Sequence, residues 1–459
     1  MTTSTSQNTH ETDTANNASC TTISTILTLA IPTFGQLIAE PAFVLIDTAI
    51  VGHIGGQALA GLSVGSTIVL TVVGLCVFLA YSTTTRVGRL LGAGKRREGL
   101  EAGIDGLWLA GIIGVVVSVA LFVIARPLCT AMGAQGSVLH NAVDYVRAVV
   151  FGIPGMLLVY AANGIFRGLQ KVRITLIAAM VGAMLNTLLD LLFILGFGWG
   201  VFGSGVATLI SQWFMAVALI VPSVLWTCAE GARLRPRLSG VLNSAGDGAV
   251  LFLRTLALRA CLVANVVLAT HMGVEVLAAY QVVNSNWNFV LNMLDAIGIA
   301  GQTLVAAQIG ARKEDEAMRL TRIAGKAGLC GGTVIGIGLM IAGWCASPLF
   351  SQSTEIQHLL TVGMMVVGVT LPLAGWMWAV DGILIGAGDY RYLALTCAAT
   401  AAIYVPCLAT IGWICDAMQV SSALRMALLW LAMNLLFVGL RAIFNGSRIG
   451  TSTWLHIVH

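Results

Sequence analysis

Long apolar stretches dominate the chain, and short polar segments separate them. Most stretches run for about twenty residues or more, the length that an α-helix needs to cross the ~30 Å hydrocarbon core of a bilayer. The pattern therefore predicts an all-α integral membrane protein with twelve transmembrane helices. We expect these helices at 24–51, 58–82, 104–125, 142–166, 174–196, 204–228, 249–272, 276–305, 326–346, 358–386, 393–413 and 421–443.

The two halves of this pattern repeat each other. A single shift of 218 residues aligns histidines, glycines and prolines at matching places in both halves. The aligned pairs include His53 with His271, Gly55 with Gly273, Gly92 with Gly310, Pro154 with Pro372, Gly164 with Gly382 and Gly168 with Gly386. The repeat predicts two homologous six-helix lobes, at 23–228 and 249–443, related by a pseudo-two-fold axis along the membrane normal. We expect an Arg-rich cytoplasmic linker at 229–248.

Composition and charge set the orientation of these helices. Only 10% of the residues are charged, whereas a soluble protein needs about a quarter. Most of the 24 Lys and Arg residues lie in loops that follow even-numbered spans, such as 83–99 and 308–326. Because basic loops stay in the cytoplasm, both termini are expected on the cytoplasmic side of the cell membrane. The loops near 53–57 and 273–275 are then external.

The ends of the chain differ from the spans. Residues 1–22 are mostly Thr, Ser, Asn and Ala, which cannot bury a core, so we predict a disordered cytoplasmic tail. The tail has no Lys or Arg, which argues against a secretory signal peptide. Residues 444–459 are expected to form a second cytoplasmic tail.

Polar side chains in the first span lie along one helix face. Gln36, Glu40 and Asp47 are spaced at multiples of about one turn. Acidic groups at membrane depth are costly, so they indicate a function or a structural partner on another helix. Pro32 and Pro41 each remove a backbone hydrogen bond and can bend this helix. A bent helix with a polar stripe is a candidate moving part.

A second polar set lies in the fifth and sixth spans. Asn186 and Asp190 are one turn apart on one face, and Thr208 follows across a Gly-rich turn at comparable depth. Together with Asp47 they form an oxygen-rich set that suits either protons or a hard cation such as Na⁺.

Further polar residues mark the C-terminal lobe. The eighth span carries an amide stripe that would be wasted on lipid and is expected to line a cavity or a helix interface. Its members are Gln281, Asn284, Asn288, Asn292 and Asp295. Asp381, in the tenth span, suits a capping role or a cavity-lining role equally well. Arg259 is a candidate counter-ion for one of the carboxylates.

No soluble-enzyme chemistry is visible in the sequence. It has no Walker loop, which excludes ATP as the energy source. The ten cysteines are scattered without a CxxC pair and are interpreted as packing residues, so we expect no metal site and no cofactor. We predict a monomeric, non-enzymatic membrane protein that binds no nucleic acid.

Several ordered motifs resemble the multidrug and toxic compound extrusion (MATE) transporters. They are the segment from Pro32 to Gly55, the Asn186-x-x-x-Asp190 pair and the segment GVATLISQW at 205–213. Two charged loops that each open with Gly-Ala, at 92–93 and 310–311, complete the set. The segments DGILIGAGD and NGSRIGTSTW are similar to the DNA-damage-inducible, DinF-like branch. The resemblance implies that Pro32 is the bending proline and Asp47 the ion-coupling or substrate-linked residue. Asn186, Asp190 and Thr208 then complete its N-terminal cation cluster.

One feature departs from the family. Another branch carries an acidic residue in the seventh helix for a C-terminal sodium site, but residues 254–270 contain no acid here. The coupling is therefore expected to rest on the N-terminal lobe. Two carboxylates in a poorly solvated pocket resist being ionised together, so we expect H⁺ as the driving ion, with Na⁺ as its rival.

The resulting functional hypothesis is a secondary active efflux transporter. It would exchange small organic compounds, often cationic and amphipathic, for H⁺ by alternating access between its two halves. The alternative is a flippase for a lipid-linked precursor or another amphiphile, which a cavity with a strongly basic centre would favour.

Overall fold

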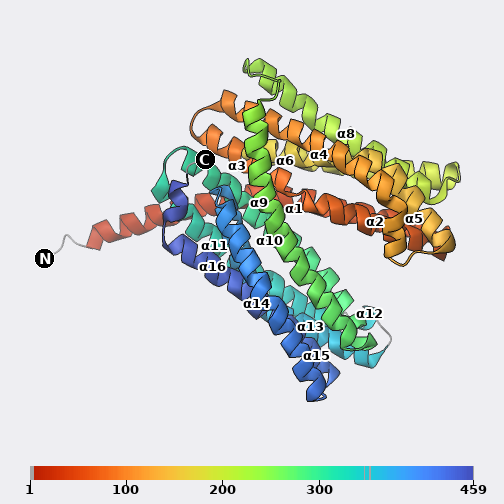
Figure 1. The fold of residues 1–459 in the computed structure, drawn as a ribbon. Helices are drawn as coiled ribbons and strands as arrows, with labels where there is room; N and C mark the ends of the chain where they lie inside the picture. The colour runs from red at the N-terminus through yellow and green to blue at the C-terminus, as the bar shows by residue number, and fades with distance from the viewer. Residues whose placement is uncertain (1–4, 346, 351–352, 458–459) are drawn as a thin grey trace. The chain divides into compact units, whose positions relative to one another are not determined.

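The computed structural model describes residues 5–345, 347–350 and 353–457, and every regular element in these ranges is helical (Figure 1). The first eight helices are α1 Thr5–Gly52, α2 Gly56–Leu75, α3 Phe78–Gly92, α4 Arg96–Ala131, α5 Gly136–Val149, α6 Ile153–Gly168, α7 Val172–Asp190 and α8 Gly200–Ala229. The next eight are α9 Leu238–His271, α10 Val274–Gly310, α11 Glu314–Cys345, α12 Ser347–Phe350, α13 Thr354–Gly386, α14 Tyr390–Ala417, α15 Ser422–Leu431 and α16 Gly439–Gly450. Short π-helical segments, Leu191–Gly196 and Ala432–Val438, extend α7 and join α15 to α16.

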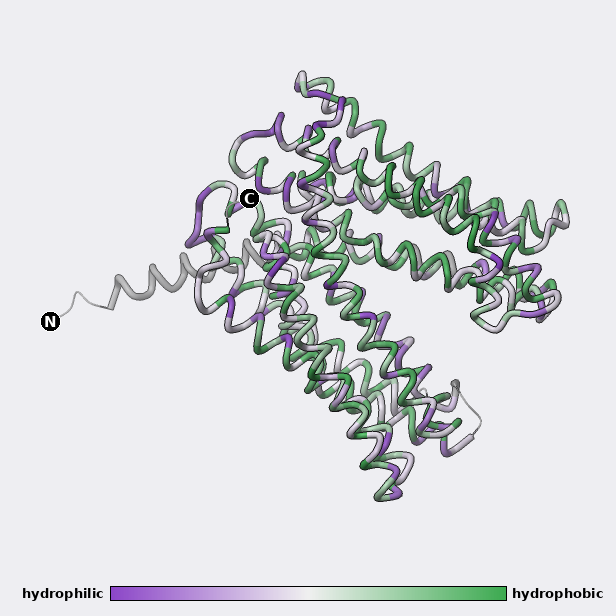
Figure 2. Tube along the Cα trace, in the orientation of Figure 1, coloured by the Kyte–Doolittle hydropathy of each residue, from purple (hydrophilic) through white to green (hydrophobic). Residues whose placement is uncertain are grey.

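The apolar pattern folds into membrane-length helices. Eleven helical stretches of the described residues are long and apolar enough to span a bilayer, and α1 adds an apolar segment at Ser24–Ala39. Several spans combine two helices, for example α2 with α3 and α5 with α6. Figure 2 shows hydrophobic residues along these helices and hydrophilic residues gathered at many of the turns. This agrees with the predicted twelve-helix, all-α fold.

The chain divides into two compact units. One contains Pro32–Phe252 with Gly310–Arg312, and the other contains Leu253–Ile309 and Lys313–His459. The described residues up to Ile31 belong to this second, C-terminal unit, although the sequence pattern assigns residue 23 onward to the N-terminal lobe. The boundary between the units therefore falls inside α1, next to Pro32.

The internal repeat is visible in the helix boundaries. Corresponding helices of the two halves begin 218 residues apart. The pairs are α2 and α10, α4 and α11, α5 and α13, and α7 and α14. The two histidines at the ends of α1 and α9 make the same local contact, since Nδ1 of His53 lies 2.7 Å from the Ala49 carbonyl and Nδ1 of His271 lies 2.8 Å from that of Val267. Gly55 and Gly273 both have a positive φ, a conformation that glycine adopts readily.

Only the first part of the predicted linker at 229–248 connects two helices; the rest belongs to α9. Its non-helical part ends before Leu238, where α9 begins. Arg86 explains why the next residues are ordered, because its guanidinium donates to Asp247 Oδ2 at 3.0 Å and to Ser244 Oγ at 2.9 Å. The start of α9 is therefore held by α3 of the same unit.

The ends of the chain are more ordered than their composition predicts. Helix α1 already begins at Thr5, so residues 5–22 are helical in the structure and not an irregular tail. No Gly or Pro interrupts the sequence between Thr5 and Ile31, which leaves nothing to end the helix. Residues 1–4 lie outside the described residues.

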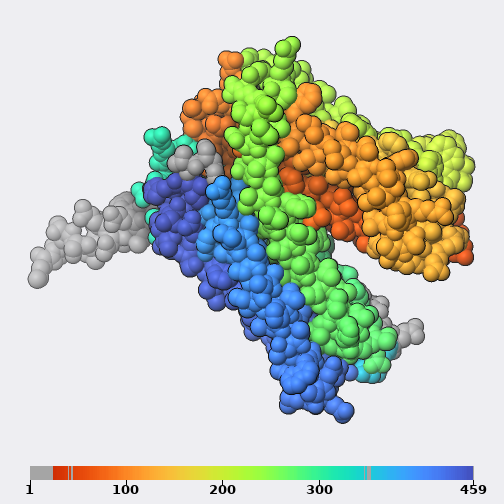
Figure 3. All heavy atoms as spheres, viewed as in Figure 1, coloured from red at the N-terminus to blue at the C-terminus, as the bar shows by residue number. Residues whose placement is uncertain are grey.

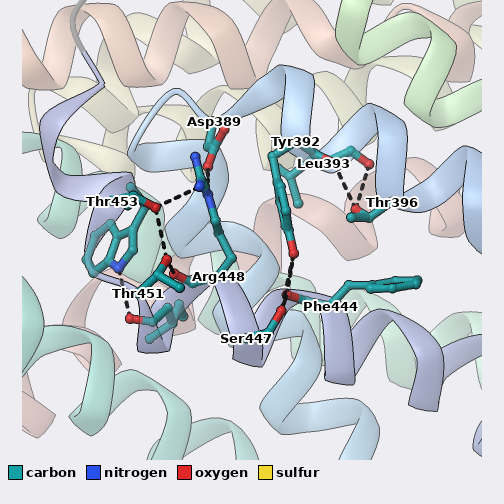
Figure 4. A network of polar contacts seen from close by, with 11 residues as sticks. Asp389, Tyr392, Leu393, Thr396, Phe444, Ser447, Arg448, Thr451 and Thr453 are labelled. Carbon is teal, nitrogen blue, oxygen red and sulfur yellow. Dashed lines mark hydrogen bonds and ion pairs between the residues drawn. The ribbon is translucent and has the colours of Figure 1, made fainter.

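The C-terminal residues pack onto the end of α14 (Figure 4). Arg448 Nε donates to Asp389 Oδ2 at 2.6 Å, and Tyr392 Oη donates to the Phe444 carbonyl at 2.6 Å. Trp454 is fully buried. The predicted tail at 444–459 is therefore folded against its own unit over its described part.

Membrane orientation can be tested with two exposed helix-start positions. In a background without the ten native cysteines, we expect Lys95→Cys to react with an impermeant maleimide only after cells are permeabilised. Val274→Cys, 85% exposed at the start of α10, is expected to react in intact cells. The physical reason is the cytoplasmic retention of basic loops. Labelling in the opposite pattern would invert the topology.

Candidate functional site

Two acids and an amide meet inside the N-terminal unit. Asn186 Nδ2, on α7, donates one hydrogen bond to Asp47 Oδ1 at 2.8 Å and another to Asp190 Oδ2 at 2.7 Å. Asp47 is 5% exposed, and Asp190 is fully buried. The two carboxyl groups also lie close enough to share a hydrogen bond when one of them is protonated. The structure thus brings together three of the four predicted coupling residues.

Local sequence explains this convergence. Asn186 and Asp190 are one helical turn apart and face the same side. Gly35 allows α1 to approach α7 closely, because a Cβ at this position would lie 2.8 Å from Leu176 Cδ1. The α-helix gives way directly after Asp190 to the π-helical segment Leu191–Gly196. Such wider turns interrupt regular packing and occur often at functional sites.

Other polar groups surround the acids. Tyr145, on α5, is buried next to both carboxylates and Thr208, the fourth predicted coupling residue. Its ring packs where Gly65 on α2 leaves space, since a Cβ there would lie 2.7 Å from Tyr145 Cδ1. Ser204 and Ser211 lie on the same face of α8 as Thr208. Neither of these buried serine hydroxyls has a hydrogen-bond partner among the described residues. These groups could bind water, a proton or a cation.

The C-terminal unit holds a neutral version of this cluster. The residues 218 positions after Asp47 and Asn186 are Asn265 and Tyr404. Their side chains also meet, because Tyr404 Oη donates to Asn265 Oδ1 at 2.8 Å. Leu408 stands at the position equivalent to Asp190. The repeat is thus preserved in geometry, but only the N-terminal unit carries acids at these positions.

A small cavity with a mixed apolar and polar lining lies in the N-terminal unit beside α1, α2, α6, α7 and α8. It has a volume of about 50 Å³, and Gln36, Tyr160, Asn163 and Gln212 supply its polar lining. Gln36 Oε1 accepts a hydrogen bond from Arg167 Nη2 at 3.0 Å. A cavity of this size with several polar groups in its wall has room for water molecules. Gln36 lines this cavity, and its role in transport stays a prediction.

Helix α1 also contains the predicted bending prolines and Glu40. Pro32 and Pro41 both lie inside the continuous helix, so each interrupts its backbone hydrogen-bond ladder. The side chain of Glu40 lies outside the described residues, and its cavity-lining role stays a prediction.

The amide stripe of α10 points away from the core of its own unit. Its opposite face is buried, with Trp287 1% exposed and Tyr280 stacked on Trp430 at a centroid separation of 5.3 Å. This packing fixes the rotation of the helix. The stripe residues are half-buried or exposed; they are Gln281, Asn284, Asn288, Asn292 and Asp295. Their predicted role in lining a cavity stays a prediction.

Asp381 is enclosed in an ion-paired cluster within the C-terminal unit. Its carboxylate is paired with Arg254, and Arg441 Nη2 and Asn445 Nδ2 donate to Oδ1 at 3.0 and 3.1 Å. Arg441 also stacks over Trp378, with 5.1 Å from its guanidinium carbon to the ring centroid. All four polar residues are at least 93% buried. This arrangement favours a structural role for Asp381 over the cavity-lining role.

The counter-ion prediction was therefore placed on the wrong arginine. Arg254, which lies near the start of the predicted seventh span, is buried within α9 and pairs with Asp381. Arg259 is exposed and makes no hydrogen bond or ion pair with any residue that the structure describes. The two residues point in different directions because five positions correspond to a rotation of about 140° on an α-helix.

Comparison with known proteins places the chain in a family. Residues 32–192 and 237–410 match the MatE family model. The chain is 26% identical to Protein DETOXIFICATION 43 of Arabidopsis thaliana, covering 93% of this chain and 90% of the relative. It is 26% identical to DNA damage-inducible protein F of Escherichia coli K12, covering 84% and 85%.

A solved structure shows the same fold. The crystal structure of the Vibrio cholerae MATE transporter VcmN in its bent form matches with a TM-score of 0.85 at 19% identity, covering 96% of this chain and 99% of that one. The family resemblance expected from the motifs is confirmed. With its membrane-length helices, buried acids and matching family model, this chain belongs to the multidrug and toxic compound extrusion family of membrane transporters.

Proposed function

We propose that this transporter exports small organic compounds, often cationic and amphipathic, in exchange for H⁺, and that the N-terminal unit carries the coupling. The observation that supports this proposal most directly is the buried Asp47–Asn186–Asp190 cluster. Its counterpart in the C-terminal unit, around Asn265 and Tyr404, contains no acid.

Asn186 gives the cluster its chemistry. Its amide uses one N–H for each carboxyl group, so it holds the two acids together in every protonation state. Two buried negative charges at this distance repel each other, and a proton relieves that repulsion. When the proton leaves, the pair regains a negative charge that attracts a cationic compound. Competition of proton and cation for the same carboxylates is the basis of exchange.

The cavity near Gln36 is the proposed entry point for substrate in this unit. Its volume of about 50 Å³ is far below the roughly 300–1,000 Å³ of sites for drug-sized ligands, so binding requires the cavity to open. Met156 and Met215 line it, and methionine side chains adapt to varied apolar shapes. Helix α1, interrupted by Pro32 and Pro41, is the proposed moving wall.

The driving ion can be identified in reconstituted vesicles. We expect a fluorescent organic cation such as ethidium to accumulate under an imposed pH gradient in sodium-free buffer. Exchange of one monovalent cation for one proton moves no net charge, so accumulation is expected at about tenfold per pH unit. Vesicles without protein give the leak rate. Accumulation that requires a sodium gradient, and is absent with the pH gradient alone, would assign the coupling to Na⁺.

A further inference from the structure

An apolar groove, lined by residues of α9 and α14, lies along the seam where these two helices pack together within the C-terminal unit. It has a volume of about 730 Å³, within the range of sites for drug-sized ligands. One face of α9 supplies most of its wall, including Val263, Ala264 and Val267, and α14 supplies Val405 and Ala409. Figure 3 shows these two helices side by side. The groove belongs to the C-terminal unit, whereas the carboxylate cluster belongs to the other unit.

Two basic residues mark the ends of the groove. Arg259 and His271 both line it, and their separation along α9 corresponds to about 18 Å at 1.5 Å per residue. His271 Nδ1 is already engaged with the Val267 carbonyl. Arg259 has no hydrogen-bond or ion-pair partner in the described part of the chain. An intramembrane arginine is costly and normally has a partner, so an anion from outside the protein is the natural complement.

The expected depth of Arg259 in the membrane limits which anions can reach it. Helix α9 ends at His271, and a hydrocarbon core of ~30 Å corresponds to about twenty helical residues. With His271 at the external boundary, as the predicted topology has it, Arg259 lies about 18 Å inside the span, near the middle of the core and well below the phosphates of bilayer lipids. A phospholipid in its normal position cannot reach it. A single-chain amphiphile with a small acidic head group can enter the groove and place that group against Arg259.

We propose that this groove binds a single-chain carboxylate amphiphile of the fatty-acid type. The carboxylate pairs with the Arg259 guanidinium, whose planar fork matches a carboxylate in two parallel hydrogen bonds. The hydrocarbon chain lies along Val263 and Val267 toward His271. The site is independent of the proposed coupling cluster and adds an anionic ligand class to this protein.

Direct binding tests the proposal on the full chain in nanodiscs of zwitterionic lipid. The probe is dansyl-labelled undecanoic acid, and its methyl ester is the neutral control with the same chain. We expect wild-type protein to bind the acid at least about tenfold more tightly than the ester, because one charge-assisted pair contributes on this scale. Arg259→Gln is expected to remove this preference, and Val263→Trp to weaken both ligands by filling the groove.

Two matched variants separate the site from general charge and from coupling. Arg391→Gln removes another exposed arginine, on α14 outside the groove, and is expected to bind both probes as wild type does. Asp47→Asn changes the coupling cluster and is also expected to bind normally. Equal binding of acid and ester by wild type would overturn the proposal, as would a preference for acid that survives Arg259→Gln. Loss of acid binding in Arg391→Gln or Asp47→Asn would place the ligand elsewhere and overturn it too.

Discussion

Replacing Asp47 by asparagine is expected to abolish concentrative efflux while the protein remains folded and inserted. Asparagine keeps the size of the side chain and an oxygen that can still accept the hydrogen bond from Asn186 Nδ2, now 2.8 Å long. The titratable proton and the negative charge of Asp47 are lost, so the Asp190 carboxyl no longer has a second acid beside it. Accumulation of a cation under a pH gradient should therefore fall from about tenfold per pH unit to no accumulation. Vesicle uptake at matched protein content measures this.

A matched acid tests whether the effect belongs to the cluster. Asp144 lies on α5 next to Tyr145, but it is partly exposed and pairs with His140. Asp144→Asn is expected to retain uptake, since this carboxylate is not in the buried cluster. Normal pH-driven accumulation by Asp47→Asn would reduce Asp47 to a structural residue and remove the main support for the coupling proposal.

The sequence was informative about the spans and the acid cluster for the same physical reason. Apolar runs of membrane length have few alternatives to helices, and polar residues at depth are conspicuous against them. Asp47, Asn186 and Asp190 could therefore be selected by residue type and helical spacing. The constant shift of 218 residues located the corresponding turns in both halves. Hence the helix starts of the two halves match in the structure.

Contacts between helices could not be predicted in the same way. Spacing tells which residues share a face but not which neighbour that face meets. The position of Arg259 deep in an apolar span predicts a counter-ion, whereas Arg254, nearer the charged linker, forms the ion pair with Asp381. Tyr145 was missed because a single tyrosine near a helix end is unremarkable without knowing that Gly65 makes room for its ring.

Together with the structure, the repeat shows that the two units carry their charged clusters at different positions. Arg254 and Asp381 stand 218 positions after Gln36 and Asn163. The N-terminal unit therefore has acids at the Asp47 level and neutral amides at the Gln36 level. The C-terminal unit has neutral residues at the first level and the Arg254–Asp381 ion pair at the second. A buried acid without arginine partners can exchange protons, whereas an acid held between two arginines is fixed by its ion pairs. This difference is our reason for assigning coupling to one unit and stability to the other.

Removal of the Asp381 carboxylate is accordingly expected to destabilise the C-terminal unit severely. Asp381→Ala leaves the buried Arg254 and Arg441 without the carboxylate that now accepts from both. Breaking a buried ion pair in this way costs about 3–5 kcal/mol. Asp416→Asn is the matched control, because its carboxylate is 64% exposed where it meets Arg425, and such surface pairs contribute about 0–1 kcal/mol. Unfolding of the purified protein in detergent measures both.

An apolar replacement of the whole cluster distinguishes stability from transport. Asp381→Leu combined with Arg254→Met and Arg441→Met is expected to recover most of the lost stability, since buried ion pairs can often be replaced by well-packed apolar residues. Trp378 and Phe437, which now stack on Arg441, would pack against the methionine. If Asp381 instead takes part in transport, Asp381→Ala would unfold like wild type yet fail to transport. Because the cluster joins α9, α13 and α16 inside one unit, we expect stability to follow the charge balance of these three residues.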